Sequence, residues 1–297
     1  EICACLVGSE MCIRDRSKGK QSMKNYGLLG WPLGHSLSPV IHRELFKISN
    51  VPGEYRLYEI EPARIEAEAP RLFELSGFNI TVPHKIGIIP LLDGLDEKAA
   101  LFGSVNTVKT GNKNTGFNTD CLGFLRALEG AGITLGGKVL LCGNGGVART
   151  IAFEAALANC ELTIACRESG IERAKALQQE IKEKTGKSVC VCEYSGLEKG
   201  WDLIINGTSV GMLPRTNACV LDKETVQSAK AVYDVIYNPA ETLLLKYARE
   251  AGIKCENGLS MLVWQAAAAQ EIWNDVKFTN EDIEKVLKIT ESELKNR

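Results

Sequence analysis

The sequence predicts a two-domain α/β protein. Its 297 residues are about twice the length of a typical domain. From Lys24 onward, short strand-like segments alternate with helical segments, and this alternation is typical of βαβ units with parallel strands. In the second half of the chain, a glycine-rich turn joins a strand to a helix, as in dinucleotide-binding sheets.

The composition is that of an ordinary globular protein. Hydrophobic residues make up 45% and charged residues 24% of the chain, and the formal net charge is −2. Proteins that bind nucleic acid carry a basic excess, so this balance argues against nucleic acid as the main partner. No apolar run approaches the roughly 20 residues that a membrane span needs, so we expect no membrane partner.

The cysteines predict neither a disulfide framework nor a zinc site. The chain has 11 cysteines and three histidines, and no two cysteines have the C-x-x-C spacing of a zinc or redox motif. Several cysteines, such as Cys142 and Cys166, lie in apolar strand-like runs, where a small buried thiol packs well. An odd number of cysteines without a secretory signal predicts a cytoplasmic location. We expect no bound metal.

Residues 1–22 do not fit the pattern of the rest of the chain. They show neither helical nor strand periodicity and lack the continuous apolar region of a signal peptide. The segment from Glu10 to Arg16 resembles the translation of an adapter used in sequencing libraries. We therefore expect residues 1–22 to be a non-native extension and Met23 to be the native start.

The first half of the chain alternates between strand and helix patterns. Apolar runs predict strands at Tyr26–Leu29, Tyr55–Ile60, Phe78–Val82 and Ser104–Lys109. Helical spacing predicts helices at Pro39–Ile48, Arg64–Leu75, Pro83–Leu92 and Asp120–Glu129. Ser38 is the expected N-cap of the first helix, because it directly precedes a proline at the first helical position.

The second half alternates more regularly. The expected strands are Lys138–Cys142, Glu161–Cys166, Ser188–Cys192, Leu203–Asn206 and Ala231–Asp234. The expected helices are Val147–Ala158, Ile171–Lys184 and Thr242–Ala251. After Gly258 the chain is mostly helical, and its charged, amphipathic end at Asn280–Arg297 predicts a surface helix.

The glycine-rich turn has the spacing G-x-G-x-x-A. It consists of Gly143, Asn144, Gly145, Gly146, Val147 and Ala148. In this motif the first glycine allows a tight turn, the second lets the backbone approach a pyrophosphate, and the third small residue keeps helix and strand close. The helix N-terminus offers free N–H groups to phosphates. Because the turn lies between a strand and a helix, we expect a dinucleotide site rather than a structural turn.

The end of the next strand selects the cofactor. An acidic residue there would bind a ribose 2′-hydroxyl, whereas an arginine would bind a 2′-phosphate. The sequence places Arg167 and Glu168 side by side, with Arg173 a short distance further along the chain. We favour NADP, with Arg167 as the main phosphate partner and Arg173 as a weaker second. A solvated charge pair at a strand end is the alternative interpretation of Arg167 and Glu168.

Short polar clusters precede the glycine turn at Gly34–Pro39, Asn79–Lys85, Ser104–Thr107 and Gly116–Asp120. Each lies at or near an expected strand end or turn, where open α/β sheets have their clefts. Any one of them alone could be only a turn or a helix start.

Together these clusters resemble the shikimate dehydrogenase family, which reduces 3-dehydroshikimate with NADPH on the route to aromatic amino acids. The shared motifs, in family order, are Ser-x-Ser-Pro, Asn-x-Thr-Val-Pro-His-Lys, Ser-Val-Asn-Thr and Gly-x-Asn-Thr-Asp. Further matches are Asn206–Met212, Asp234–Pro239 and Asn257–Gln265. The resemblance extends from Lys24 to Trp273.

The resemblance implies the following roles. Lys85 and Asp120 would be the catalytic pair. The substrate-binding residues would be Ser36 and Ser38 for the carboxylate, Thr81, Asn106 and Gln265 for the hydroxyls and the carboxylate surroundings, and Tyr237 as a pocket wall. The cofactor-binding residues would be Gly143, Asn144, Gly145, Gly146, Val147, Ala148, Arg167, Arg173, Thr208, Met212 and Gly258.

The implied chemistry suits these residue types. Hydride addition to a ketone leaves negative charge on the carbonyl oxygen, and a protonated Lys85 can stabilise that charge and donate the proton. Asp120 can orient the ammonium group and keep it charged. Small hydrogen-bonding groups suit a polyhydroxylated acid, because they reject analogues that leave them unpaired.

One departure from the family pattern and three rival functions keep alternatives open. The family commonly has Asn-Arg-Thr where this chain has Cys166-Arg167-Glu168, which puts the strength of the NADP preference in doubt. A quinate/shikimate dehydrogenase that uses NAD or NADP would share the fold and the catalytic pair, although the two serines favour shikimate. A catalytically silent dinucleotide-binding regulator would not need both Lys85 and Asp120, and a folate-linked dehydrogenase would leave the serine and Asn-Thr-Asp motifs unexplained.

The expected organisation has three parts after the extension. Residues 23–119 form an α/β substrate-binding and catalytic domain, 120–257 a Rossmann-like NADP-binding domain, and 258–297 C-terminal helices that pack back on the first domain. The active site lies in the cleft between the domains, where closure brings the cofactor to the ketone. The expected partner is a small-molecule substrate, and the protein is a monomer or a homodimer.

Overall fold

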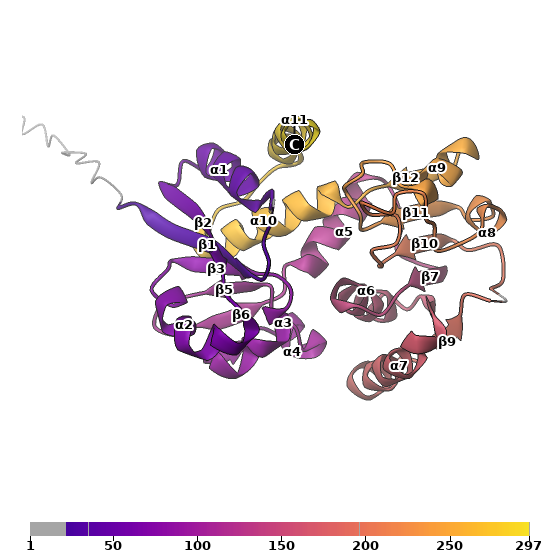
Figure 1. Cartoon of the computed structure of the whole chain (residues 1–297), viewed down its shortest axis with the longest axis horizontal. Coiled ribbons are helices and arrows are strands. Elements are labelled where there is room, and N and C mark those ends of the chain that lie inside the picture. The colour runs from indigo at the N-terminus through magenta and orange to yellow at the C-terminus, as the bar shows by residue number, and fades with distance from the viewer. Residues whose placement is uncertain (1–21, 35, 196, 297) are drawn as a thin grey trace, which may run out of the picture.

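The computed structural model describes residues 22–34, 36–195 and 197–296. These residues form two six-stranded sheets with helices packed around them, so the predicted α/β class is confirmed (Figure 1). The predicted non-native extension lies outside the described residues, apart from Ser22. Within the described part of the chain, no helix combines the length and apolar character that crossing a bilayer requires.

The first sheet has the strand order β2-β1-β3-β5-β6-β4. Its strands are β1 (Lys24–Gly30), β2 (Gly53–Glu59), β3 (Gly77–Ile80), β4 (Gly94–Leu95), β5 (Thr107–Lys109) and β6 (Thr115–Phe117). β1 is parallel to β2 and β3, whereas β5 is antiparallel to both β3 and β6. The expectation of parallel pairing is therefore wrong for β5, because its short connection to β6 allows only a hairpin.

Two of the predicted helices of the first half, at Arg64–Leu75 and Pro83–Leu92, are shorter than expected, whereas those at Pro39–Ile48 and Asp120–Glu129 have close to their predicted bounds. The helices of this half are α1 (Ser38–Ser49), α2 (Ile65–Leu72), α3 (His84–Gly87), α4 (Glu97–Phe102) and α5 (Asp120–Gly130), with 3-10 turns η1 (Pro62–Arg64) and η2 (Ile89–Leu91). The predicted helix from Pro83 to Leu92 is broken because Pro90 cannot continue an α-helix. The prediction of Ser38 as N-cap is also wrong. Leu37 holds that position, and the Ser38 amide donates to the Ser36 Oγ at 3.2 Å.

The second sheet is parallel throughout, as predicted, with the order β12-β11-β10-β7-β8-β9. Its strands are β7 (Lys138–Cys142), β8 (Glu161–Cys166), β9 (Cys190–Glu193), β10 (Leu203–Asn206), β11 (Ala231–Asp234) and β12 (Lys254–Glu256). Its helices are α6 (Gly146–Leu157), α7 (Ile171–Thr185), α8 (Lys223–Gln227) and α9 (Leu243–Glu250), with the 3-10 turn η3 (Glu168–Gly170) before α7.

Both faces of the second sheet are covered. Val139 and Leu141 of β7 pack with α5, α6 and α7, whereas Leu140 and Cys142 pack with α8 and α9. Burial on both faces explains why β7 is a continuous apolar run rather than an alternating one.

Two C-terminal helices complete the fold. α10 (Leu259–Asn274) lies beside α5 between the two sheets, and it also contacts α1 (Figure 1). Near its end, the Trp273 ring stacks on Tyr26 of β1 with centroids 4.9 Å apart. α11 (Asn280–Lys295) is amphipathic as expected and buries Ile283 and Val286 in a cluster with α1 and α10.

Candidate active site

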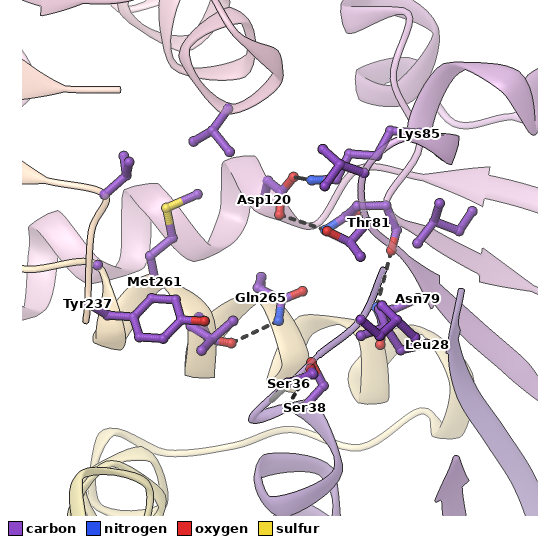
Figure 2. Close-up of a pocket in the computed structure, with 18 of the residues that line it drawn as sticks. Leu28, Ser36, Ser38, Asn79, Thr81, Lys85, Asp120, Tyr237, Met261 and Gln265 are labelled. Atoms are coloured by element: carbon purple, nitrogen blue, oxygen red, sulfur yellow. Dashed lines mark hydrogen bonds and ion pairs between the residues drawn. The ribbon is translucent and has the colours of Figure 1, made fainter. Parts of the chain in front are cut away.

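A cavity of about 480 Å³ brings together the residues predicted for substrate and catalysis (Figure 2). The predicted residues in its lining are Ser36, Ser38, Thr81, Lys85, Asn106, Asp120, Tyr237 and Gln265. They come from the β1–α1 loop, the ends of β3 and β11, the approach to β5, and the helices α1, α3, α5 and α10. No single element could supply them, so the cavity depends on how the two halves of the chain pack.

The centre of the cavity wall is an ion pair. The Lys85 Nζ donates to the Asp120 Oδ2 at 2.6 Å, and only 17% and 11% of the two side chains are exposed. Asp120 is the first residue of α5, where the helix dipole favours a negative charge. Lys85 lies on α3, which Pro83 and Pro90 restrict to one turn. The arrangement is a lysine side chain held by a carboxylate inside a cavity that also carries hydroxyl and amide side chains.

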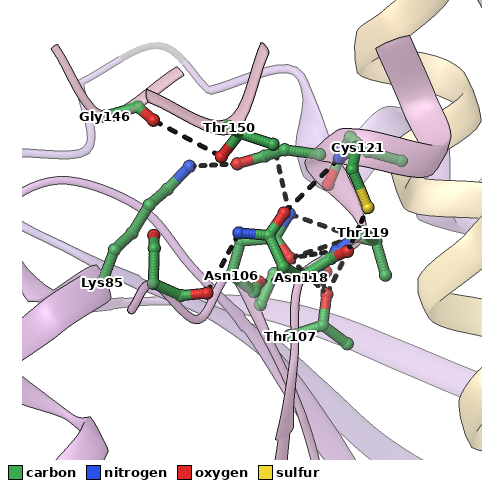
Figure 3. Close-up of polar contacts among 12 residues, drawn as sticks. Lys85, Asn106, Thr107, Asn118, Thr119, Cys121, Gly146 and Thr150 are labelled. Atoms are coloured by element: carbon green, nitrogen blue, oxygen red, sulfur yellow. Dashed lines mark hydrogen bonds and ion pairs between the residues drawn. The ribbon is translucent and has the colours of Figure 1, made fainter. Parts of the chain in front are cut away.

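The carboxylate has a second donor. The Asn106 Nδ2 donates to the Asp120 Oδ1 at 2.8 Å, so each carboxylate oxygen accepts one hydrogen bond (Figure 3). The Asn106 Oδ1 in turn accepts from the Thr119 amide at 2.6 Å. The turn before α5 is held by Asn118, whose Nδ2 donates to the Ser104 carbonyl at 3.0 Å. The polar residues of this turn therefore fix the start of α5.

A second cavity of about 1140 Å³ adjoins the first. Val82, Lys85, Val147, Val235 and Tyr237 line both cavities, so the two are direct neighbours. Of the residues predicted to bind the cofactor, Gly146, Val147, Thr208 and Met212 line the second cavity, and Val147 and Gly258 line the first. Lys85 lines both cavities, so the structure places it in the same cavities as these predicted cofactor-binding residues.

The glycine turn fits a phosphate-bearing group. Gly143 has φ +101°, and a Cβ there would lie 2.7 Å from the Thr208 Cγ2, so this position requires glycine. At Gly145 and Gly146 a Cβ would meet nothing within 4 Å, which leaves open space at the N-terminus of α6. Ala148 is fully buried against Gly207. The turn therefore offers close backbone access from its open side and tight packing from the other.

The predicted arginines lie on the exposed corner between β8 and α7. The Arg173 guanidinium donates to the Asn144 Oδ1 at 2.7 Å, and the Asn144 Nδ2 donates to the Gly170 carbonyl at 2.7 Å. Asn144 therefore joins the glycine turn to this corner. Arg167 and Glu168 are both exposed there. The structure shows Arg173, the weaker prediction, in direct contact with the turn.

The structure explains why position 258 is a glycine and position 208 a threonine. A Cβ on Gly258 would lie 2.0 Å from the Val235 carbonyl oxygen, so only glycine allows this approach. The Thr208 hydroxyl donates to the Asn206 Oδ1 at 2.7 Å, which fixes the loop after β10. Both residues hold the walls of the cavities in place.

The sequence analysis missed several residues of the lining. Asn79, Leu28, Val235 and Met261 line the first cavity, and Ser209 lines the second. Asn79 could have been found, because it lies two residues before Thr81 on the same side of a strand. His84 of the same motif is buried, and its Nε2 lies 2.6 Å from the Ile60 carbonyl oxygen, so it holds the fold.

Comparison with known proteins assigns the family. Residues 28–108 match the family model described as the shikimate dehydrogenase substrate binding domain. The shikimate dehydrogenase (NADP(+)) of Geobacillus kaustophilus is 40% identical over 255 residues, which are 84% of this chain and 92% of that relative.

Solved structures agree with this assignment. A shikimate dehydrogenase in complex with NADP+ superposes with a TM-score of 0.84 at 36% identity, covering 90% of this chain and 95% of that one. The shikimate 5-dehydrogenase of Listeria monocytogenes, in complex with shikimate and NAD, has a TM-score of 0.83 at 32% identity, covering 89% and 96%. The chain belongs to the shikimate dehydrogenase family of NADP-dependent oxidoreductases.

Proposed function

We propose that Lys85 and Asp120 are the acid–base pair with which this family member interconverts 3-dehydroshikimate and shikimate. The observation that carries the proposal is their 2.6 Å contact inside the cavity that also holds the predicted substrate-binding residues. Lysine is usually solvated, so a lysine held by a carboxylate in a cavity calls for a function.

Bound NADPH supplies the hydride for the reduction. Negative charge then develops on the carbonyl oxygen, and the Lys85 ammonium group stabilises it and donates the proton that completes the hydroxyl. Asp120 holds the ammonium group in place through its 2.6 Å contact. In the oxidation direction, Lys85 accepts the hydroxyl proton.

The remaining predicted residues are assigned by their place in the lining. Ser36 lies in the β1–α1 turn and Ser38 is the first residue of α1, and both are proposed to bind the substrate carboxylate. The proposed partners of the hydroxyls and the carboxylate surroundings are Thr81, Asn106 and Gln265, with Tyr237 as a wall. Because a site that bonds each hydroxyl discriminates against other patterns, we favour shikimate over quinate.

The cofactor is proposed to extend from the exposed β8–α7 corner to Lys85. Its proposed partners are Gly143, Asn144, Gly145, Gly146, Val147, Ala148, Arg167, Arg173, Thr208, Met212 and Gly258. The open space beside Gly145 and Gly146 supports the pyrophosphate position. The guanidinium groups at the corner support a 2′-phosphate.

The organisation of the chain is part of the proposal. The first sheet uses residues from Lys24 to Phe117 and the second from Lys138 to Glu256, which supports domains at 23–119 and 120–257 with helices 258–297 returning to the first. We place the enzyme in the cytoplasm, as a monomer or a homodimer. The free cysteines in the described part of the chain support a reducing compartment.

The test is steady-state oxidation of shikimate and quinate, each with NADP and NAD, by the protein beginning at Met23 and by Lys85→Ala. We expect the highest kcat/KM for shikimate with NADP and a fall in kcat of at least about 100-fold in Lys85→Ala. Lys109→Ala, which removes an exposed lysine of β5, is the matched control and should leave kcat unchanged. Near-normal turnover in Lys85→Ala would refute the catalytic assignment, and a preference for quinate with NAD would refute the substrate assignment.

A further inference from the structure

A chain of hydrogen bonds, partly buried at its first link and buried beyond it, leads from β2 to Asp120. The Tyr55 hydroxyl donates to the Asn79 Oδ1 at 2.8 Å, and the Asn79 Nδ2 donates to the Thr107 Oγ1 at 2.9 Å. Asn79 and Thr107 are direct partners in the antiparallel register of β3 and β5, so their side chains lie side by side on one face of the sheet. Asn79, Thr107 and Asn106 are all at most 4% exposed.

The next link joins the Thr107 and Thr119 hydroxyls to the Asn106 side chain, and both possible orientations of the hydroxyls give the Asn106 Oδ1 a donor. The Thr107 and Thr119 hydroxyl oxygens lie 3.0 Å apart, and each lies 3.2 Å from the Asn106 Oδ1 (Figure 3). The Thr107 Oγ1 accepts a hydrogen bond from the Asn79 Nδ2. The Thr107 hydroxyl therefore donates its own hydrogen bond either to the Asn106 Oδ1 or to the Thr119 Oγ1. In the second case the Thr119 hydroxyl donates to the Asn106 Oδ1. In either arrangement, the Asn106 Oδ1 accepts a hydrogen bond from one threonine hydroxyl.

This donor fixes the orientation of the Asn106 amide. The Oδ1 receives both the hydroxyl and the Thr119 amide at 2.6 Å, so a flipped amide would oppose donor to donor. The Nδ2 is thereby directed at the Asp120 Oδ1. Asp120 in turn holds Lys85 through its other oxygen.

Tyr55, at the other end of the hydrogen-bond chain, is also a donor. Burial raises the pKa of Tyr55 well above its usual value, so the phenol retains its proton and acts as a donor. The Tyr55 ring is also held in place, because it stacks on His42 with centroids 4.0 Å apart. Each group therefore donates toward the catalytic carboxylate, and aligned hydrogen bonds polarise one another.

We infer that Thr107 and Asn79 are positioning residues that hold Asn106, and through it Asp120 and Lys85, in the reactive arrangement. The inference rests on the proposed role of Lys85 and Asp120. Neither residue needs to touch substrate for this role. Without the Thr107 hydroxyl, the Asn106 Oδ1 loses one of its donors and keeps only the Thr119 amide and hydroxyl, so the Asn106 amide is held less firmly toward Asp120.

The test compares Thr107→Val with Thr107→Ser. The Val variant keeps the shape of the side chain without its hydroxyl, and we expect kcat to fall about 10-fold, the lower end for groups that orient the partners of a reactive centre. The KM for NADP should stay within about twofold, because Thr107 lines neither cavity. The Ser variant restores the hydroxyl and should recover most of kcat.

Thr290→Val is the matched control. Thr290 is a fully buried threonine of α11 whose hydroxyl donates to the Val286 carbonyl at 2.7 Å, so the substitution removes a comparable bond away from the chain described here. Its kcat should equal that of the unmodified protein. Should Thr107→Val fail to fold, Tyr55→Phe removes only the first donor and keeps the ring over His42. For that variant we expect a fall in kcat of about threefold.

A folded Thr107→Val enzyme with unchanged kcat would overturn the inference, as would a serine variant no better than valine or an unchanged kcat in Tyr55→Phe. Measuring Lys85→Ala alongside separates the two proposals. Loss of turnover in Lys85→Ala with normal turnover in Thr107→Val would reject the positioning role alone. Normal turnover in Lys85→Ala would reject the catalytic pair itself.

Discussion

At the scale of single residues, the choice of cofactor depends on the corner between β8 and α7. Arg173 contacts Asn144 of the glycine turn through its guanidinium, whereas Arg167 and Glu168 are exposed beside it. A guanidinium binds a phosphate through charge-assisted, bidentate hydrogen bonds, and a carboxylate would instead accept from ribose hydroxyls. The arginines therefore favour NADP, and Glu168 opposes them only if it turns toward the ribose.

We expect Arg173→Gln and Arg167→Gln each to raise the KM for NADP by about 10-fold or more, the cost of one lost charge-assisted hydrogen bond. The KM for NAD should barely change, because NAD lacks the 2′-phosphate. Initial rates with both cofactors provide the measurement, and Glu168→Gln is the matched control, expected to leave the KM for NADP unchanged or lower. Equal losses with NADP and NAD would contradict a phosphate contact.

At the scale of elements, Asp234 ties the end of β11 to the loop that carries Tyr237. Its carboxylate accepts from the Thr242 hydroxyl at 2.6 Å, and from the Asn206 Nδ2 and the Ile236 amide, both at 3.0 Å. Burial nevertheless raises the pKa of Asp234 from 3.8 to about 6, since these donors offset only part of the desolvation of the charge. Burying the ionised Asp234 carboxylate therefore lowers the free energy of unfolding.

The raised pKa predicts a pH dependence of stability with a definite sign. Between pH 4 and pH 6 the folded state holds the Asp234 proton more tightly than the unfolded state does. The contribution of Asp234 to the free energy of unfolding is therefore largest below pH 4 and falls by about 3 kcal/mol as the pH rises above 6. Asp234→Asn is neutral at every pH, so the stability difference between the two proteins, from urea unfolding at pH 4 and pH 7, should change by this amount. A difference independent of pH would contradict the prediction.

At the scale of the whole molecule, the two halves of the chain meet where α4 packs on α6. The Phe102 and Phe153 rings lie 5.5 Å apart, and the Lys98 Nζ donates to the Glu154 Oε1 at 2.6 Å. Glu154 is 5% exposed, whereas 39% of the Lys98 side chain is exposed. A second connection is the Arg126–Glu271 ion pair between α5 and α10. These contacts fix how the predicted substrate-binding residues are placed relative to the glycine turn.

Removing Lys98 should destabilise the fold, because Glu154 would remain buried without its partner. We expect Lys98→Met to lower the free energy of unfolding by about 1–2 kcal/mol, less than for a fully buried pair because Lys98 is partly solvated. The double variant Lys98→Met/Glu154→Gln should recover most of the loss in urea unfolding experiments. Lys199→Met, which breaks the exposed pair with Glu224, is the control and should leave the unfolding midpoint unchanged. Additive losses in the double variant would argue against a direct interaction.

The sequence alone determined the features that depend on local patterns. The strands β7, β8, β10 and β11 follow from apolar runs, and the start of α6 follows from the glycine turn. The sequence motifs also named the polar residues that meet in the first cavity. The very short strands β4, β6 and β12 were missed, because two or three residues are too few to show a period.

The tertiary structure alone decided which side chains meet. Lys85 and Asp120 lie 35 residues apart in sequence, and their contact depends on how α3 and α5 are placed. The antiparallel register of β5 places Thr107 opposite Asn79, and the β8–α7 corner brings Arg173 to Asn144. Such pairs leave no periodic signal in the chain, because long-range contacts are set by the packing of whole elements, while strand and helix patterns reflect only each residue and its near neighbours.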